Sequence, residues 1–197
     1  MKEENKKAKK IINIVFITVM VLMVLVATDI ILVAKKEVGP FLAIPVKTYK
    51  DGGTKEYYGL GYKVIKYHQT QGRRDMVIGF WSLKYDTNPI EVDDVDLSIE
   101  LNENKEATYK KYINQFVRIE SALVKNDVEN NEIILAYYDE GEKYSIELIC
   151  SIEKEKDKIL ILEEGSETTV LGTIYKYEES KESNIKRFYL KHCFVEQ

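Results

Sequence analysis

The sequence has few of the residues that carry out metal-dependent or nucleophilic chemistry. It contains two cysteines and two histidines, and His68 and His192 have no Cys or carboxylate partners at metal-ligand spacing. The Gly-x-Ser-x-Gly motif of serine hydrolases and the His-Glu-x-x-His motif of zinc peptidases are absent. We therefore expect no catalytic residues, no metal and no cofactor, and an enzyme with an unrecognised site is the remaining alternative.

Charge is nearly absent from one long stretch near the N-terminus. Residues 11–34, IINIVFITVMVLMVLVATDIILVA, contain a single charged residue, Asp29. A helix rises about 1.5 Å per residue, so this run is long enough to cross the roughly 30 Å hydrocarbon core of a bilayer. The sequence therefore predicts a transmembrane helix over 11–34.

The flanks of this run predict its orientation. Five lysines lie in residues 1–10, whereas two lysines follow the run closely. Because lysine-rich flanks stay in the cytoplasm, we expect a cytoplasmic tail over 1–10 and the bulk of the chain outside the membrane. A cleaved secretory signal is the alternative, but its apolar core is typically about 7–15 residues, and no site here has small residues at both −3 and −1.

Asp29 is the one ionisable group inside the apolar run. Such a group is a functional candidate when it lies at the centre of a bilayer. Asp29 is six positions before Lys35, about two helical turns from the outer interface. We expect it to reach water there or to stay protonated.

The rest of the chain divides by charge. Residues 37–86 carry eight Lys and Arg against five Asp and Glu, about +3, and residues 87–197 carry fourteen against twenty-five, or −11. The boundary is predicted within DTNPIEVDDVD, residues 86–96, where a proline follows an asparagine and four carboxylates cluster. Those carboxylates could hold Ca²⁺, but they lack the spacing of a known loop and are interpreted as a solvated linker: Glu91, Asp93, Asp94 and Asp96.

Residues 38–88 read as an aromatic β-hairpin or meander. YYGLGYKVIKY and MVIGFWSLKY are rich in strand-forming residues and are separated by HQTQGRRD, while PFLAIPVKTY is a possible third strand. DGG at 51–53 indicates a turn, and no phosphate-binding loop is expected because no helix follows the glycines. KTYKDGGTKEYYGLGYKVIKY with GRRDMVIGFWSLKY, within residues 46–86, resembles a segment of uncharacterised membrane-anchored proteins of Gram-positive bacteria, clostridia and bacilli. That resemblance implies a bacterial cell-surface location.

The C-terminal part contains five strand-like runs, at 113–124, 132–138, 143–152, 167–177 and 185–196. A short helix is predicted between the third and fourth, over 153–165. This order is that of an OB-fold, a five-stranded Greek-key barrel. Residues 107–196 also resemble the bacterial tRNA-anticodon-binding-like OB family. The fold class is therefore mainly β: one N-terminal transmembrane helix, a β-hairpin or meander, and a five-stranded OB-like barrel over 97–197.

Tyrosines in the predicted strands are the candidate ligand-binding residues of the barrel. Tyr137, Tyr175 and Tyr177 could stack on bases, on sugars or on a protein partner, and packing within the sheet is the alternative. Because a module of charge −11 repels phosphates, we expect no nucleic-acid partner, and we expect an envelope protein partner instead. The predicted function is a binding module on the cell surface, with two alternatives: a structural component of an envelope complex, or a nucleic-acid- or oligosaccharide-binding OB domain.

The two cysteines lie near the ends of the third and fifth predicted strands. These strands are neighbours in an OB barrel, so Cys150 and Cys193 could form a disulfide. Two buried thiols are the alternative.

Overall fold

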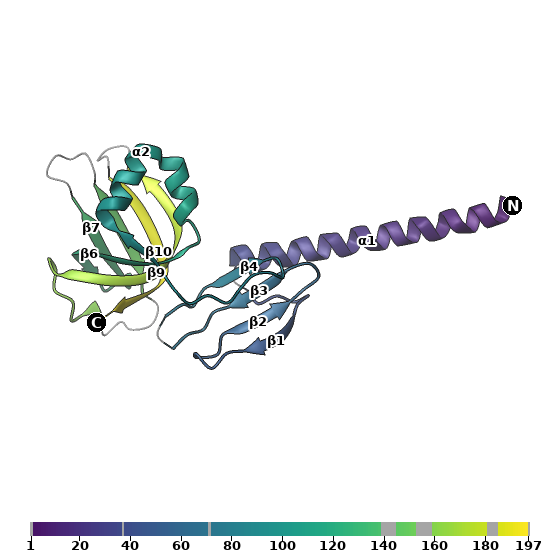
Figure 1. Ribbon diagram of the computed structural model, residues 1–197, viewed down its shortest axis with the longest axis horizontal. Helices are drawn as coiled ribbons and strands as arrows, with labels where there is room; N and C mark the ends of the chain where they lie inside the picture. Colours follow the sequence, from purple (N-terminus) through teal and green to yellow (C-terminus); the bar gives the residue numbers. More distant parts are fainter. Residues whose placement is uncertain are drawn as a thin grey trace. The chain divides into compact units, whose positions relative to one another are not determined.

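The computed structural model describes residues 2–36, 38–70, 72–138, 145–152, 159–180 and 185–196, and of residues 2–8 and 36 only the backbone. Two compact units share the chain: Met1–Gln69 with Asp75–Tyr85, and Thr70–Arg74 with Asp86–Gln197. The fold is mainly β, with one N-terminal apolar helix, a β-meander and a closed five-stranded barrel (Figure 1).

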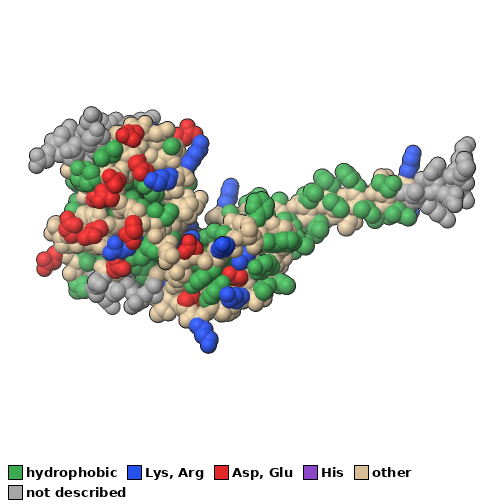
Figure 2. Space-filling model, in the orientation of Figure 1, with side chains coloured by type: hydrophobic (Ala, Val, Ile, Leu, Met, Phe, Trp, Pro, Cys, Tyr) green, Lys and Arg blue, Asp and Glu red, His purple; other side chains and the backbone are tan. Residues whose placement is uncertain are grey.

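The first unit begins with a single long helix, α1 (Lys2–Lys36). Within the part of the chain that the structure describes, it is the one helix long and apolar enough to cross a membrane. Every side chain from Lys9 to Leu25 is exposed, and Figure 2 shows apolar side chains along this length. A helix with apolar residues on all sides needs an apolar surrounding to hide them.

A four-stranded antiparallel meander follows α1. It consists of β1 (Ile44–Thr48), β2 (Lys55–Tyr58), β3 (Lys63–Lys66) and β4 (Met76–Gly79), hydrogen-bonded in that order. The predicted DGG turn joins β1 to β2, with both of its glycines at positive φ. YYGLGYKVIKY, predicted as one strand, is two: Gly61, at φ 83°, lies in a tight turn between β2 and β3.

The last turns of α1 pack on this meander. Val33 is buried with Ala43, Tyr62 and Val64, and Val26 and Ile30 lie against the same cluster. The spacing 26, 30, 33 is that of one face of a helix, so the C-terminal part of α1 has a buried face that its first part lacks. Residues 26–33 therefore belong to the core of the first unit.

The second unit is a closed barrel of five strands. They are β6 (Phe116–Asp127), β7 (Glu132–Tyr137), β8 (Ile146–Ser151), β9 (Glu167–Glu179) and β10 (Lys186–Glu196). The hydrogen-bonded order is β6-β7-β8-β10-β9, and β6 pairs with β9 to close the circle. β8 and β10 run parallel, whereas the other pairs of the circle are antiparallel. This is the OB topology that the sequence predicted.

Apolar side chains at every second position of the strands fill the interior of the barrel. Ile146, Leu148 and Cys150 of β8 are buried, and the residues between them are only half-buried. A period of two places such residues on one face of a strand. Phe188 is among the largest fully buried side chains of the core.

Two elements of the second unit were not predicted. β5 (Ile90–Asp93) pairs in parallel with β6, and α2 (Asp94–Tyr112) follows it directly. Asp93 caps α2 by accepting a hydrogen bond from the Asp96 N–H at 3.0 Å. The helix predicted over 153–165 lies partly outside the described residues, and Leu162–Gly165 are not helical.

Candidate functional site

Asp29 is the polar centre of the first unit. Its side chain is fully buried, and its carboxylate accepts hydrogen bonds from the Phe41 and Leu42 N–H groups, both at 3.0 Å, and from the Tyr62 hydroxyl. Burial, and then this hydrogen bond, raise the pKa of Tyr62, because ionisation would remove the donor. The expectation that Asp29 reaches water is wrong, because the side chain is buried and fastens α1 to the loop and sheet that follow.

A second polar cluster lies within the meander. Tyr49 and Tyr85 stack with ring centroids 3.9 Å apart, and the Tyr85 hydroxyl donates to Asp51 at 2.9 Å. Burial opposes ionisation of Asp51, but hydrogen bonds from Thr54 and Tyr85 outweigh it and lower the pKa of Asp51 to about 2. These groups satisfy one another, so they stabilise the turn and offer no open site.

The three candidate tyrosines do not form one site. Tyr137 is half-buried and packs against the barrel core. Tyr177 packs against Phe188 with ring centroids 5.1 Å apart, and burial followed by Glu179 raises its pKa to about 12. Tyr175 is 42% exposed and lies on the outside. Of the three, Tyr175 is the one placed to contact a ligand by its ring.

A β-bulge separates Tyr175 from Tyr177. Lys176 pairs with Tyr189 of β10, but the next pair is Ile174 with Leu190, so Tyr175 is an extra residue in β9. A bulge of this kind re-aims the side chain that it carries. Without the bulge, Tyr175 and Tyr177 would lie on the same face of β9, because they are two positions apart.

Around Tyr175 the outer surface of β9 and β10 carries aromatic and basic side chains. Tyr175 meets Tyr189 edge to face, with centroids 6.3 Å apart. The Lys176 amine lies 4.5 Å from the Tyr189 ring centroid, and the Lys191 amine 6.0 Å from that of Tyr175. We call this surface the β9–β10 platform and define it by five residues: Tyr175, Lys176, Arg187, Tyr189 and Lys191.

Acidic residues hold the platform in place. Glu178 accepts from the Tyr189 hydroxyl at 2.7 Å and pairs with Lys176 at 2.6 Å, and hydrogen bonds from these two groups lower its pKa. Glu147 of β8 pairs with Arg187 at 2.6 Å. Lys176 and Arg187 are thus each held by a carboxylate beside the tyrosine rings.

The missed members of the platform had a sequence signal. Arg187, Tyr189 and Lys191 are spaced by two in RFYLKH, which places them on one face of a strand. The prediction weighed net charge over the whole module and so passed over this local pattern.

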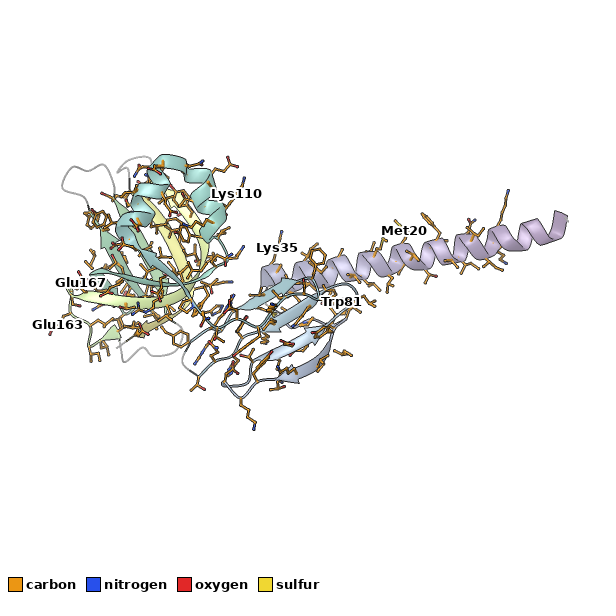
Figure 3. The ribbon with its side chains drawn as sticks, in the orientation of Figure 1. Met20, Lys35, Trp81, Lys110, Glu163 and Glu167 are labelled. Atoms are coloured by element: carbon orange, nitrogen blue, oxygen red, sulfur yellow. The ribbon has the colours of Figure 1, made fainter. Side chains whose placement is uncertain are left out.

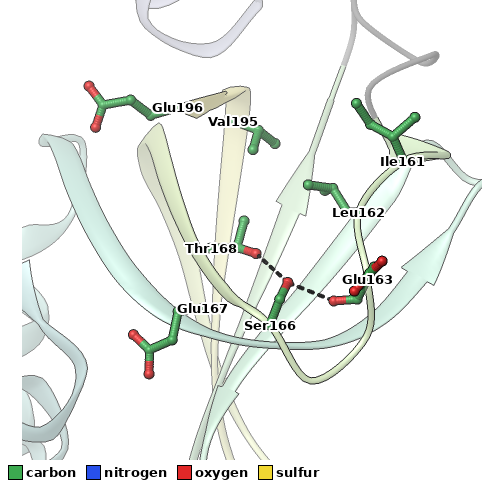
Figure 4. A pocket seen from close by; sticks show the side chains of 8 residues that line it. All are labelled: Ile161, Leu162, Glu163, Ser166, Glu167, Thr168, Val195 and Glu196. Atoms are coloured by element: carbon green, nitrogen blue, oxygen red, sulfur yellow. Dashed lines mark hydrogen bonds between the residues drawn. The ribbon is translucent and has the colours of Figure 1, made fainter.

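A shallow pocket of 240 Å³ lies elsewhere on the barrel (Figure 4). The Ser166 hydroxyl donates to the Glu163 carbonyl at 2.7 Å. The carboxylates of Glu167 and Glu196 point away from the pocket. Its volume is below that of most ligand sites, which begin at about 300 Å³. The remaining lining residues are Ile161, Leu162, Thr168 and Val195.

The acidic cluster at 91–96 is structural. Asp93 caps α2, Asp94 accepts from the Ser121 hydroxyl, and Glu91 pairs with Arg118 at 3.2 Å. The interpretation as a solvated linker was wrong, because these residues form β5 and the start of α2. Among the described residues no group of His, Cys, Asp and Glu is arranged to hold a metal ion.

Both cysteines are buried thiols in the structure. Cys150 lies in β8 beside Leu190 of β10, and Cys193 is three positions further along β10. The Cys193 sulfur faces Gly172 of β9, where an added Cβ would lie only 2.8 Å from it.

No family model and no curated protein matches the chain, so the resemblance of 46–86 to Gram-positive proteins has no support there. Among solved structures, a lipoprotein of Klebsiella pneumoniae to which nucleic-acid binding is ascribed is 16% identical, with a TM-score of 0.39, over 55% of this chain and 92% of that one. A Leishmania major protein assigned as an aspartyl-tRNA synthetase is 14% identical, with a TM-score of 0.36, over 58% and 22%. A murine DNA-binding protein, bound to double-stranded DNA, is 10% identical, with a TM-score of 0.31, over 79% and 92%.

The expectation of no nucleic-acid partner is contradicted by these neighbours, which include a DNA-bound protein and a lipoprotein with a nucleic-acid-binding assignment. The physical error lay in applying a net charge of −11 to every surface of the module. A ligand meets a local surface, and surface charges act over about 8 Å at physiological ionic strength. The β9–β10 platform brings basic side chains and tyrosine rings together within an acidic module.

Proposed function

We propose that the chain is a single-pass protein of the bacterial cell membrane that holds an OB-like binding domain outside the cytoplasm. The observation that carries this proposal is the hydrogen-bonding of Asp29 by the Phe41 and Leu42 N–H groups. It makes the end of the apolar helix part of a folded unit. The lysines of residues 1–10 favour a cytoplasmic N-terminus.

The packing of α1 argues against a cleaved signal. Cleavage after Ala34 would remove both Asp29 and Val33, and it would leave the Phe41 and Leu42 N–H groups without their acceptor; cleavage after Ala27 would remove Val26 from the cluster on the meander. An anchor is kept, whereas a signal sequence is removed. The intact mass of the chain extracted from membranes tests this: we expect the full 22.9 kDa, and loss of residues 1–27 or 1–34 would contradict it.

The ligand-binding role rests on the β9–β10 platform. Exposed tyrosines with lysine and arginine beside them are the combination that binds single-stranded nucleic acid, by stacking and by phosphate contact. Tyr175 offers the ring, and Lys176, Arg187 and Lys191 offer the charge. Single-stranded nucleic acid is therefore the ligand class that we assign to this surface.

Titration of the full chain in detergent with a fluorescent single-stranded oligonucleotide tests this assignment. Base stacking contributes about 1–3 kcal/mol, so Tyr175→Ala should weaken binding by about 5- to 150-fold. Tyr109→Ala is the matched control, because Tyr109 of α2 is 38% exposed and lies outside the platform. With three cations, log K should fall against log salt with a slope of about −2.

Two results would refute the nucleic-acid assignment: no binding at low salt, or equal weakening by Tyr175→Ala and Tyr109→Ala. A neutral oligosaccharide serves as a second probe. Binding of the sugar with a salt-independent affinity would reassign the platform to glycans and leave the membrane anchoring untouched.

A further inference from the structure

The meander has an uncharged end and a charged end. Strand pairing places Ile44, Tyr58, Lys63 and Gly79 in one row at one end of the sheet. The three segments beyond this row, 38–43, 59–62 and 80–83, contain no charged residue. The opposite end carries charges of both signs: Lys50, Asp51, Lys55 and Lys66. The two ends therefore suit different surroundings.

Large apolar side chains are exposed at the uncharged end. Phe80 is 80% exposed, Trp81 59%, and Phe41 and Leu60 56% each. The Trp81 ring nitrogen donates to the Gly59 carbonyl at 3.0 Å, so its one polar atom is satisfied while the ring faces outward. We call these four residues the apolar rim. Grouped exposed apolar residues on one surface mark an interaction site.

The apolar rim lies at a defined level along α1. Phe41 is bonded to Asp29 through its N–H, and Tyr62, which follows the 59–61 turn, is bonded to Asp29 through its hydroxyl. Figure 3 shows Trp81 on the side of the meander toward Met20, away from Lys35. The rim thus faces the part of α1 that is exposed all round.

The length of that exposed part sets the level of the bilayer. Residues 11–25 are exposed all round and span about 22 Å, short of the roughly 30 Å that a hydrocarbon core requires. A helix needs about 20 residues to cross the full hydrocarbon core, so the membrane-embedded part of α1 runs from Ile11 to Ile30. The outer boundary of the hydrocarbon core then lies beside Asp29, at the level of the apolar rim.

We propose that the apolar rim inserts into the interfacial region of the same bilayer that α1 crosses, so that the meander is seated on the membrane surface. The inference rests on the proposed anchoring of α1. Tryptophan and other aromatic residues are enriched at this depth, where the ring is in an apolar layer and the N–H is satisfied. The charged end of the meander stays in water.

Trp81 is the single tryptophan of the chain, so its fluorescence reports this end of the meander alone. The full chain is reconstituted in phosphatidylcholine vesicles with and without lipid brominated near the headgroup. Because interfacial tryptophan lies within reach of these bromines, we expect loss of about half of the Trp81 emission and little quenching by aqueous iodide. The matched control is Trp81→Phe with Lys50→Trp, which reports the charged end and should show the reverse.

A second variant tests the apolar rim itself. Leu60→Asp with Phe80→Asp changes two exposed side chains and leaves the core intact, and it should return Trp81 to iodide access. Vesicle flotation separates the two proposals. If the chain does not float with vesicles, the anchoring of α1 is refuted; if it floats but Trp81 behaves as the Lys50→Trp control does, the seating of the meander is refuted and the anchor stands.

Discussion

Tyr62 donates its hydroxyl hydrogen to Asp29, 33 positions earlier in the chain. With the Phe41 and Leu42 N–H groups it gives the buried carboxylate three donors. A buried carboxylate is stable only when such donors surround it. The apolar helix and the meander are therefore one folded unit, and the end of the helix is held at a fixed place on the sheet.

Asp29→Leu should loosen this attachment and keep the helix apolar. It removes the acceptor of two part-buried N–H groups, those of Phe41 and Leu42, and each lost hydrogen bond should cost about 0.5–1.5 kcal/mol. We expect the Leu42 amide to exchange its hydrogen about 10- to 100-fold faster. Thr28→Leu is the control, because Thr28 is exposed beside Asp29 and should not change exchange. Equal exchange in both variants would show that the carboxylate does not hold the loop.

Asp51 should make the meander sensitive to acid. Its ordinary pKa is 3.8 and the folded value is about 2, so the unfolded chain takes up the proton first as pH falls. The stabilisation by Asp51 is complete above pH 4 and declines from there toward pH 2. The difference in melting temperature between the natural chain and Asp51→Ala, followed by circular dichroism in detergent, should shrink over this range. A difference that stays constant to pH 2 would contradict the assignment.

Gly172 should be intolerant of a methyl group. An added Cβ would lie 2.8 Å from the Cys193 sulfur and 3.3 Å from the Leu190 Cβ, so Gly172→Ala should destabilise the barrel by about 1–3 kcal/mol. Cys193→Ala in the same chain should recover part of the loss. Gly39→Ala, which meets nothing within 4 Å, is the control for a harmless glycine change. Additive effects of Gly172→Ala and Cys193→Ala would show that the two residues do not meet.

The cysteines give a simpler test. Both are buried thiols in the structure, so thiol titration of the unfolded chain without reductant should find two reactive groups. A count of zero with the mass of a monomer would show that Cys150 and Cys193 are joined by a disulfide in the cell. The stability of the barrel would then include a covalent term.

Alternation made the barrel predictable. Ile146, Leu148 and Cys150 are spaced by two in the sequence and are buried in β8, because a strand turns every second side chain inward. α2 was missed because its apolar residues are few and far apart. Its buried positions include Leu97, Leu101 and Tyr112, and the carboxylates at its start resembled a linker. The cap at Asp93 was the signal that could have revealed it.

The platform was beyond what alternation predicts. Tyr175 and Tyr177 look equivalent in ETTVLGTIYKY, yet a bulge turns one outward and leaves the other against Phe188. A bulge depends on the pairing with β10, which is made by residues far along the chain. Asp29 illustrates the same limit, since its partners Phe41, Leu42 and Tyr62 are set by the tertiary fold.

The central claim is that α1 is an uncleaved anchor with the barrel outside the membrane. Cysteine labelling on intact, wall-stripped cells tests it directly, with the buried Cys150 and Cys193 first replaced by alanine. We expect impermeant maleimide to label a cysteine introduced at Glu129, an exposed residue after β6, and not one introduced at Asn5. Labelling at Asn5 and not at Glu129 would contradict the account, as would loss of the Glu129 cysteine from the membrane fraction into the medium.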